Sequence, residues 1–138
     1  MKIIQVVGRS NSGKTTFIKQ LIPKLKTQGR VAVIKHLGDH EYELEVGKDT
    51  TGFFDAGADI SVGIDAHKSV AAIRNNSLES ALQLLFDQGM NFTVIEGFKQ
   101  RAFPKIVIGD LETDQCVLTN PSPDEVLESL NAFEDFCP

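Results

Sequence analysis

A short apolar run near the start of the chain leads directly into a glycine-rich loop, and this loop limits the fold more than any other feature. Residues 3–7 read IIQVV, and residues 8–15 read GRSNSGKT, which fits the pattern G-x-x-x-x-G-K-[ST]. The loop must curl so that several backbone N–H groups point at one phosphate, and glycine at both ends permits that curl. The pattern therefore predicts a strand, a phosphate-binding loop and a helix whose positive end faces the same anion.

Two side chains at the end of this loop have expected tasks. Lys14 brings a point charge to the β- and γ-phosphates, and the Thr15 hydroxyl can ligate Mg²⁺. The alternative is a glycine-rich turn with a surface lysine, which the strand before it and the amphipathic helix after it make the weaker interpretation. The loop therefore predicts nucleotide binding, but it identifies neither the nucleotide nor the reaction.

Strand-like and helix-like segments alternate along the rest of the chain. The apolar pattern predicts helices over residues 15–26 and 51–56, a third that Asn76 caps with Glu79 as capping-box partner, and a last one that Ser122 caps. We expect Pro23 to kink the first helix. Strands are expected at residues 3–7, 31–34, 92–95, 105–108 and 116–118. This order predicts an α/β fold, a three-layer P-loop NTPase fold with a largely parallel sheet, and an antiparallel hairpin at residues 60–73.

Length and composition exclude several classes of protein. The 138 residues suggest one domain over residues 1–138, and 41% apolar with 24% charged residues is ordinary for a globular chain. No apolar run approaches the ~20 residues that span a bilayer, so we expect no membrane association. A net charge of −5 argues against nucleic acid as a partner. Two cysteines make a poor disulfide framework, and the apolar stretch at residues 3–7 is too short for the apolar region of a secretory signal, so a cytoplasmic protein is expected.

A phosphate-binding loop of this kind needs a carboxylate for its Mg²⁺. Glu96 follows the apolar segment 92–95, and a carboxylate at the end of a parallel strand faces the ligand crevice; the alternative is an exposed loop acid. Asp49 lies in the polar segment 47–50, where a helix cap is an equally good interpretation. Our catalytic candidates are therefore Lys14, Glu96 and Asp49, and our metal-ligand candidates are Thr15, Glu96 and Asp49.

Further polar residues follow the expected strands at 31–34 and 92–95. His36, Asp39 and His40 can contribute to a metal or water environment, although solvated polar residues are the better interpretation of this segment. Lys99 and Arg101 can offer positive charge to a phosphate-bearing ligand, and two solvated loop charges are an equally weighted alternative.

The order of the motifs resembles that of the molybdopterin-guanine dinucleotide biosynthesis protein B (MobB) family. The matching segments are GRSNSGKTT at 8–16, IKH at 34–36, GKDT at 47–50, AGAD at 56–59, VIEGFK at 94–99 and PKIVI at 104–108. The resemblance implies a GTP-binding protein that assists the attachment of GMP to molybdopterin and hydrolyses GTP weakly. It also implies a homodimer, a guanylyltransferase as partner and a molybdopterin-bearing ligand.

The resemblance also implies roles for individual residues. The phosphates would be held by Gly8, Arg9, Ser10, Asn11, Ser12, Gly13, Lys14, Thr15 and Thr16. Thr15 with Glu96 or Asp49 would organise Mg²⁺. Lys35, His36, Lys48 and Lys99 match motif positions without an assigned role.

The guanine-reading signature N-K-x-D of many GTPases is absent. Asn120 and Asp124 are four residues apart in TNPSPD, which does not fit that signature, and the expected contact of this segment with the base is through backbone groups. A preference for GTP over ATP is therefore implied by the resemblance alone.

Two other functions are compatible with the phosphate-binding loop. The first is a small-molecule kinase, which generally needs a lid whose arginines clamp the transferred phosphoryl group. The chain has only four arginines and no arginine-rich segment, so this alternative ranks second. The other is an interaction module in which the nucleotide is structural.

Overall fold

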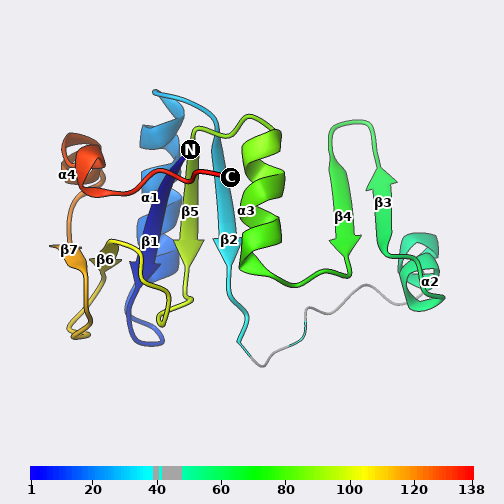
Figure 1. The fold of residues 1–138 in the computed structure, drawn as a ribbon, viewed down its shortest axis with the longest axis horizontal. Coiled ribbons are helices and arrows are strands. Elements are labelled where there is room, and N and C mark those ends of the chain that lie inside the picture. Colours follow the sequence, from blue (N-terminus) through cyan, green and yellow to red (C-terminus); the bar gives the residue numbers. More distant parts are fainter. Residues whose placement is uncertain (39–40, 42–47) are drawn as a thin grey trace. The chain divides into compact units, whose positions relative to one another are not determined.

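The computed structural model describes residues 1–38, 41 and 48–138, which form two compact units. The first unit comprises Met1–Gly38 and Leu82–Pro138, and the second comprises Asp39–Ala81. Each unit has its own sheet (Figure 1). Two compact units can belong to one folding domain, so the expectation of a single nucleotide-binding domain stays a prediction.

The first unit is built on a five-stranded parallel sheet with the order β2-β5-β1-β6-β7. The strands are β1 (Lys2–Val7), β2 (Val31–Lys35), β5 (Phe92–Glu96), β6 (Lys105–Val107) and β7 (Cys116–Thr119). β1 lies at the centre and most of its residues are buried, which explains why its sequence is almost continuously apolar. The predicted α/β architecture with a largely parallel sheet is confirmed.

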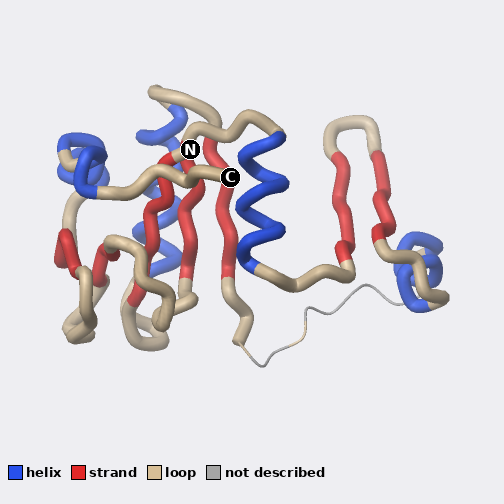
Figure 2. Tube along the Cα trace, viewed as in Figure 1, coloured by secondary structure: helices blue, strands red, loops and turns tan. Residues whose placement is uncertain are grey.

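Helix α1 (Lys14–Lys26) packs against β2, β5 and the short helix α4 (Pro123–Glu128) (Figure 2). The helix continues through Pro23 to Lys26, because Leu21 and Leu25 on either side of the proline are fully buried in the core. At α4, Ser122 and Glu125 form the predicted capping box, with Pro123 at the start of the helix.

Helix α3 (Leu78–Asp87) begins one residue later than the sequence predicts. Ser77 is the capping residue, since its Oγ accepts a hydrogen bond from the Ser80 N–H at 3.0 Å. The expected cap, Asn76, and its expected partner, Glu79, are therefore wrong. This start places Leu78 and Leu82 one helical turn apart, and both are buried.

The second unit contains α2 (Asp49–Asp55) and the antiparallel strands β3 (Ile60–Ile64) and β4 (Ser69–Ile73). These strands form the predicted hairpin. On the side of α2, the Ser61 hydroxyl donates to the Thr50 carbonyl at 2.8 Å. None of the helices in the described residues is long and apolar enough to cross a membrane.

Candidate functional site

The glycine-rich loop lies at the carboxyl end of β1, between β5 and β6. Val6 of β1 pairs with Glu96 of β5, and Val7 pairs with Val107 of β6, so both neighbouring strands end beside the loop. The chain reaches β2 and β5 on one side of β1 and then crosses to β6 on the other. In open α/β sheets, ligands bind at such a point, outside the carboxyl ends of the strands.

The loop curls through two left-handed residues, Asn11 with φ 61° and Gly13 with φ 99°. Its lysine folds back over it, since Lys14 Nζ donates to the carbonyl oxygens of Gly8 and Arg9, both at 2.9 Å. The buried Ser12 Oγ has no hydrogen-bond partner among the described residues. Successive backbone N–H groups in such a mixture of right- and left-handed residues form a concavity that can bind an anion, so the curl is compatible with a bound phosphate.

Helix α1 begins in this loop without a side-chain cap. Gly13 is its N-cap residue, and its first turn carries no acidic side chain. The first N–H groups of a helix lack partners within the helix, and a phosphate at this position would satisfy them. An uncapped start on a thirteen-residue helix therefore favours an anionic ligand.

The segment that follows β6 packs directly against the loop. A Cβ atom at Gly8 would lie 2.5 Å from the Ile108 carbonyl oxygen and 2.7 Å from Ser12 Oγ. Gly109 is held in turn by Asn120, whose Oδ1 accepts from the Gly109 N–H at 2.7 Å and whose Nδ2 donates to its carbonyl at 3.0 Å. The sequence analysis expected only a backbone contact of the Asn120 segment with the base, and did not predict that the Asn120 side chain holds Gly109.

Lys35, Lys99 and the Glu96 carboxylate lie near Lys14 at the end of the loop. The pKa of Lys14 lies below its ordinary value, first because of burial and also because Lys99 and Lys35 are close, while Glu96 opposes the shift. Lys35 Nζ lies 3.9 Å from Glu96 Oε1, and the Glu96 side chain is only 13% exposed. The excess of positive charge suits a polyphosphate.

The structure brings several of the predicted site residues together but not all of them. The loop, Glu96, Lys35 and Lys99 belong to one neighbourhood of the first unit. Asp49 belongs to the second unit, where it is the first residue of α2 after the N-cap Lys48, so it is not itself the cap. Asp39 and His40 lie outside the described residues.

Oxygen ligands for a metal are present at the loop. The Thr15 hydroxyl and the Glu96 carboxylate are hard donors of the type that Mg²⁺ prefers, and Mg²⁺ ordinarily keeps several waters beside one or two carboxylates. Within the described ranges, no group of three or more His, Cys, Asp or Glu side chains is arranged to hold a metal ion. This donor set therefore fits Mg²⁺ bound together with phosphate, and does not resemble a cage that the protein alone would form.

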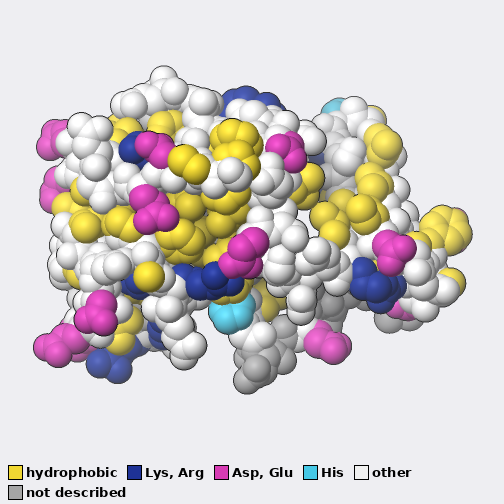
Figure 3. All heavy atoms as spheres, viewed as in Figure 1, with side chains coloured by type: hydrophobic (Ala, Val, Ile, Leu, Met, Phe, Trp, Pro, Cys, Tyr) yellow, Lys and Arg dark blue, Asp and Glu magenta, His cyan; other side chains and the backbone are white. Residues whose placement is uncertain are grey.

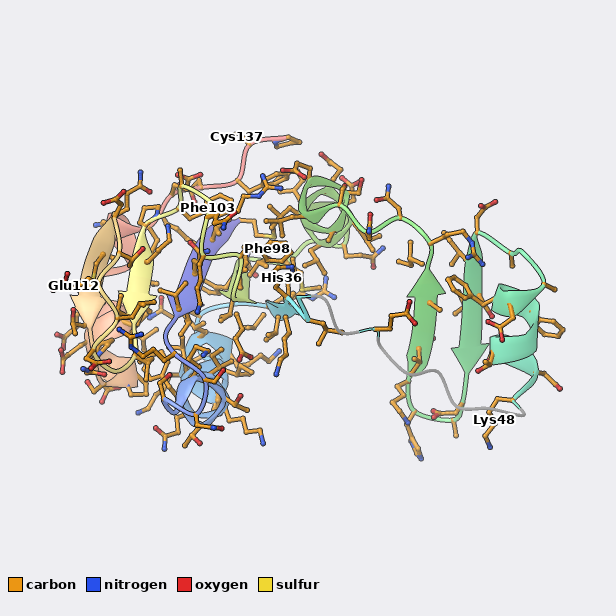
Figure 4. The ribbon with its side chains drawn as sticks, turned by 90° about the horizontal axis from the view of Figure 1, so that it is seen from below. His36, Lys48, Phe98, Phe103, Glu112 and Cys137 are labelled. Atoms are coloured by element: carbon orange, nitrogen blue, oxygen red, sulfur yellow. The ribbon has the colours of Figure 1, made fainter. Side chains whose placement is uncertain are left out.

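A tight turn follows β5 and carries an aromatic pair (Figure 4). His36, directly after β2, stacks on Phe98 with ring centroids 4.1 Å apart and planes 16° from parallel. The His36 N–H donates to the Glu96 carbonyl at 2.9 Å, so the ends of β2 and β5 are joined at this point. A Cβ at Gly97 would lie 2.9 Å from His36 Cβ, which explains the glycine there.

Comparisons of sequence and of fold find several similar proteins. The model of the family "MobB: Molybdopterin guanine dinucleotide synthesis protein B" matches residues 3–128. A probable molybdopterin-guanine dinucleotide biosynthesis adapter protein of Bacillus subtilis is 39% identical over 123 residues, covering 83% of this chain and 71% of that protein. A putative adapter protein of the same description from Methanocaldococcus jannaschii is 36% identical over 112 residues, covering 78% of this chain but 47% of that protein. The crystal structure of Bacillus subtilis MobB superposes with a TM-score of 0.73 at 28% identity, covering 97% of this chain and 99% of that one.

The crowding at Gly8 gives a first prediction. Gly8→Ala should lower the free energy of unfolding by about 1–3 kcal/mol, because the new methyl group meets the Ile108 backbone and cannot be accommodated without displacing the loop. Gly52→Ala in α2 is the matched control, since nothing lies within 4 Å of the added atom and alanine favours the helix. Urea unfolding followed by circular dichroism measures both. Equal stability of Gly8→Ala and the parent chain would contradict this account of the loop.

Proposed function

Because the chain belongs to the family of molybdopterin-guanine dinucleotide synthesis protein B (MobB), we propose that it is a GTP-binding adapter protein of molybdopterin-guanine dinucleotide biosynthesis that hydrolyses GTP weakly. The observation that carries the proposal is the uncapped start of α1 in a curled loop, with Lys14, Lys35 and Lys99 gathered beside it. The names of the relatives support the adapter role.

Each part of the site has a task in this proposal. The backbone N–H groups of residues 8–16 and the Lys14 ammonium hold the phosphates, and Lys35 and Lys99 add positive charge around them. Thr15 and Glu96 are the proposed ligands of Mg²⁺, which neutralises phosphate charge when bound; Asp49 is the proposed alternative to Glu96. Weak hydrolysis agrees with an adapter, in which binding matters more than turnover.

The proposal extends to partners. The partner enzyme is a guanylyltransferase, and a molybdopterin-bearing ligand meets the nucleotide where the two proteins join. We place this encounter in the cytoplasm. The preference for GTP rests on family membership, because the Asn120 side chain is engaged with Gly109 and no N-K-x-D signature is present.

The kinase alternative finds no support among the arginines. Arg9 pairs with Asp110 at 3.2 Å, Arg30 donates to the Gln88 carbonyl, and Arg74 lies over the Phe54 ring at 3.9 Å. Arg9 belongs to the loop itself, while Arg30 and Arg74 have structural partners elsewhere, so these three side chains do not form an arginine-bearing lid.

A homodimer is part of the proposal, and its support is the hairpin of the second unit. Apolar side chains are exposed on the hairpin (Figure 3). Thr50 of α2 contacts Ser61 and Gly63, so α2 lies on the face opposite to Ile60, Val62 and Ile64. The exposed fractions are 56% for Ile60, 50% for Val62, 80% for Ile64 and 42% for Ile73. A two-stranded sheet is marginal alone, so we propose that a second copy of the chain covers this face.

Loss of the ammonium group tests nucleotide binding. GTP at 100 times its Kd should stabilise the parent chain by about 2.7 kcal/mol, and Lys14→Ala should lose this stabilisation. Lys26→Ala, at the far end of the same helix, should retain it. Thermal melts with GTP and with ATP measure the effect and compare the two bases. The same GTP-induced shift in Lys14→Ala would show that Lys14 does not hold the phosphates.

Loss of the carboxylate tests the metal assignment. Glu96→Gln keeps the shape of the side chain but removes its charge, so the Mg²⁺ concentration needed for full GTP-dependent stabilisation should rise at least about tenfold. Glu128→Gln in α4 serves as the control. An unaltered Mg²⁺ titration would transfer the ligand role from Glu96 to Asp49.

A charge on the apolar face tests the dimer. The parent chain should sediment as a dimer at micromolar concentration and Ile64→Glu as a monomer, because burying an unpaired carboxylate is costly. Leu84→Glu changes an exposed apolar residue of α3 and should leave the dimer intact. Analytical ultracentrifugation separates these states. A parent chain that is monomeric throughout would rule out the homodimer.

A further inference from the structure

Gln5 is a fully buried polar residue in the middle of the central strand. Its exposed fraction is 0%, and it lies between Ile95 of β5 and Lys105 of β6. Its Oε1 has no hydrogen-bond partner among the described residues. A buried amide with an unsatisfied acceptor is a poor way to fill a core, so the packing alone does not explain why glutamine is present.

The amide nitrogen of Gln5 has a defined task. Nε2 donates to the carbonyl oxygens of Gly97 at 2.8 Å and Phe98 at 2.7 Å, which are the two residues that follow Glu96. Both have left-handed backbones, Gly97 with φ 96° and Phe98 with φ 53°. A positive φ is strained for phenylalanine, and such a conformation persists only where its surroundings hold it. The two hydrogen bonds from Gln5 of β1 stabilise this conformation.

The turn that Gln5 holds belongs to the candidate site. Glu96 precedes it, Lys99 follows it, and its Phe98 ring stacks on His36 (Figure 4). Both Glu96 and Lys99 are close enough to influence the charge of Lys14. Backbone hydrogen bonds also hold the turn: the Gly97 N–H donates to the Val6 carbonyl at 3.2 Å, the His36 N–H to the Glu96 carbonyl at 2.9 Å, and the Arg101 N–H to the Phe98 carbonyl at 2.9 Å. Gln5 adds the side-chain hydrogen bonds to the two left-handed residues themselves.

We propose that Gln5 is a positioning residue that, through the strained Gly97–Phe98 turn, sets the Glu96 carboxylate for the Mg²⁺ that accompanies the nucleotide. Gln5 itself touches neither ligand. The inference has two parts. That Gln5 positions Glu96 for Mg²⁺ rests on the proposed nucleotide function, whereas that Gln5 fixes the conformation of the turn does not.

The structural half is tested without nucleotide. Gln5→Met keeps the length of the side chain and removes the amide, so the turn should relax and the His36–Phe98 stack should open. In ¹H NMR spectra the His36 ring protons of the parent chain should be shifted upfield by the Phe98 ring, with His67 in the exposed β3–β4 turn as internal reference. In Gln5→Met they should move toward the His67 position; an unchanged His36 shift would overturn the proposal.

The functional half is tested by binding of a fluorescent GTP analogue with EDTA and with Mg²⁺. In EDTA, Gln5→Met should bind the analogue with the same Kd as the parent, because the phosphate loop is intact. The factor by which Mg²⁺ lowers the Kd should be about tenfold smaller in Gln5→Met than in the parent. Thr93→Val is the matched control, since it replaces a buried polar residue on the same face of the sheet, two residues before Ile95. It should leave both measurements unchanged.

The outcomes separate the two proposals. If His36 moves but the Mg²⁺-dependent tightening in Gln5→Met equals that of the parent, Gln5 does not position Glu96 and the inference fails while nucleotide binding stands. If the parent chain binds no nucleotide, the proposed function fails and the link to Mg²⁺ fails with it, whereas the His36 shift still decides whether Gln5 holds the turn.

Discussion

The parallel pairing of β1 with β5 on one side and β6 on the other is the constraint on which the rest of the structure depends. It brings the ends of three strands to one edge, so that the phosphate loop after Val7, the turn after Glu96 and the segment after Val107 become neighbours. Lys14 thereby shares one charged neighbourhood with Glu96 and Lys99, which lie 82 and 85 positions further along the chain. No local preference of the loop sequence could bring Glu96 or Lys99 to Lys14 without this register.

Local patterns were sufficient to predict the elements that depend on a few adjacent residues. The loop, the helix after it, the β3–β4 hairpin and the capping box at Ser122 each have a short signature with a direct physical cause. The α3 cap was missed because Asn76 and Ser77 are both good capping residues. Local hydrogen bonds distinguish them, since the Ser77 hydroxyl accepts from the Ser80 N–H and the Asn75 side chain accepts from the Ser77 N–H.

For the candidate site, residues within one motif could be predicted from the sequence, whereas contacts between strands could not. Lys14 and Thr15 follow from the motif, and Glu96 follows from its position at the end of an apolar strand. The support of Gly8 by Ile108, the Asn120 amide on Gly109 and the Gln5 amide under Phe98 were not foreseen, because each joins residues from different strands. The sequence alone does not indicate the role of a glutamine in an apolar strand. That role is seen only from the two carbonyl groups, of Gly97 and Phe98, to which Gln5 donates.

The folded-back ammonium group of Lys14 has a consequence for the affinity of the loop for anions. Since it already donates to two main-chain oxygen atoms of its own loop, an incoming ligand must offer better acceptors than those carbonyls before the lysine exchanges partners. Charged phosphate oxygens form the stronger bond. An anion that binds at the lysine therefore replaces hydrogen bonds that the loop already has, and only the difference between the old and the new hydrogen bonds adds to its affinity.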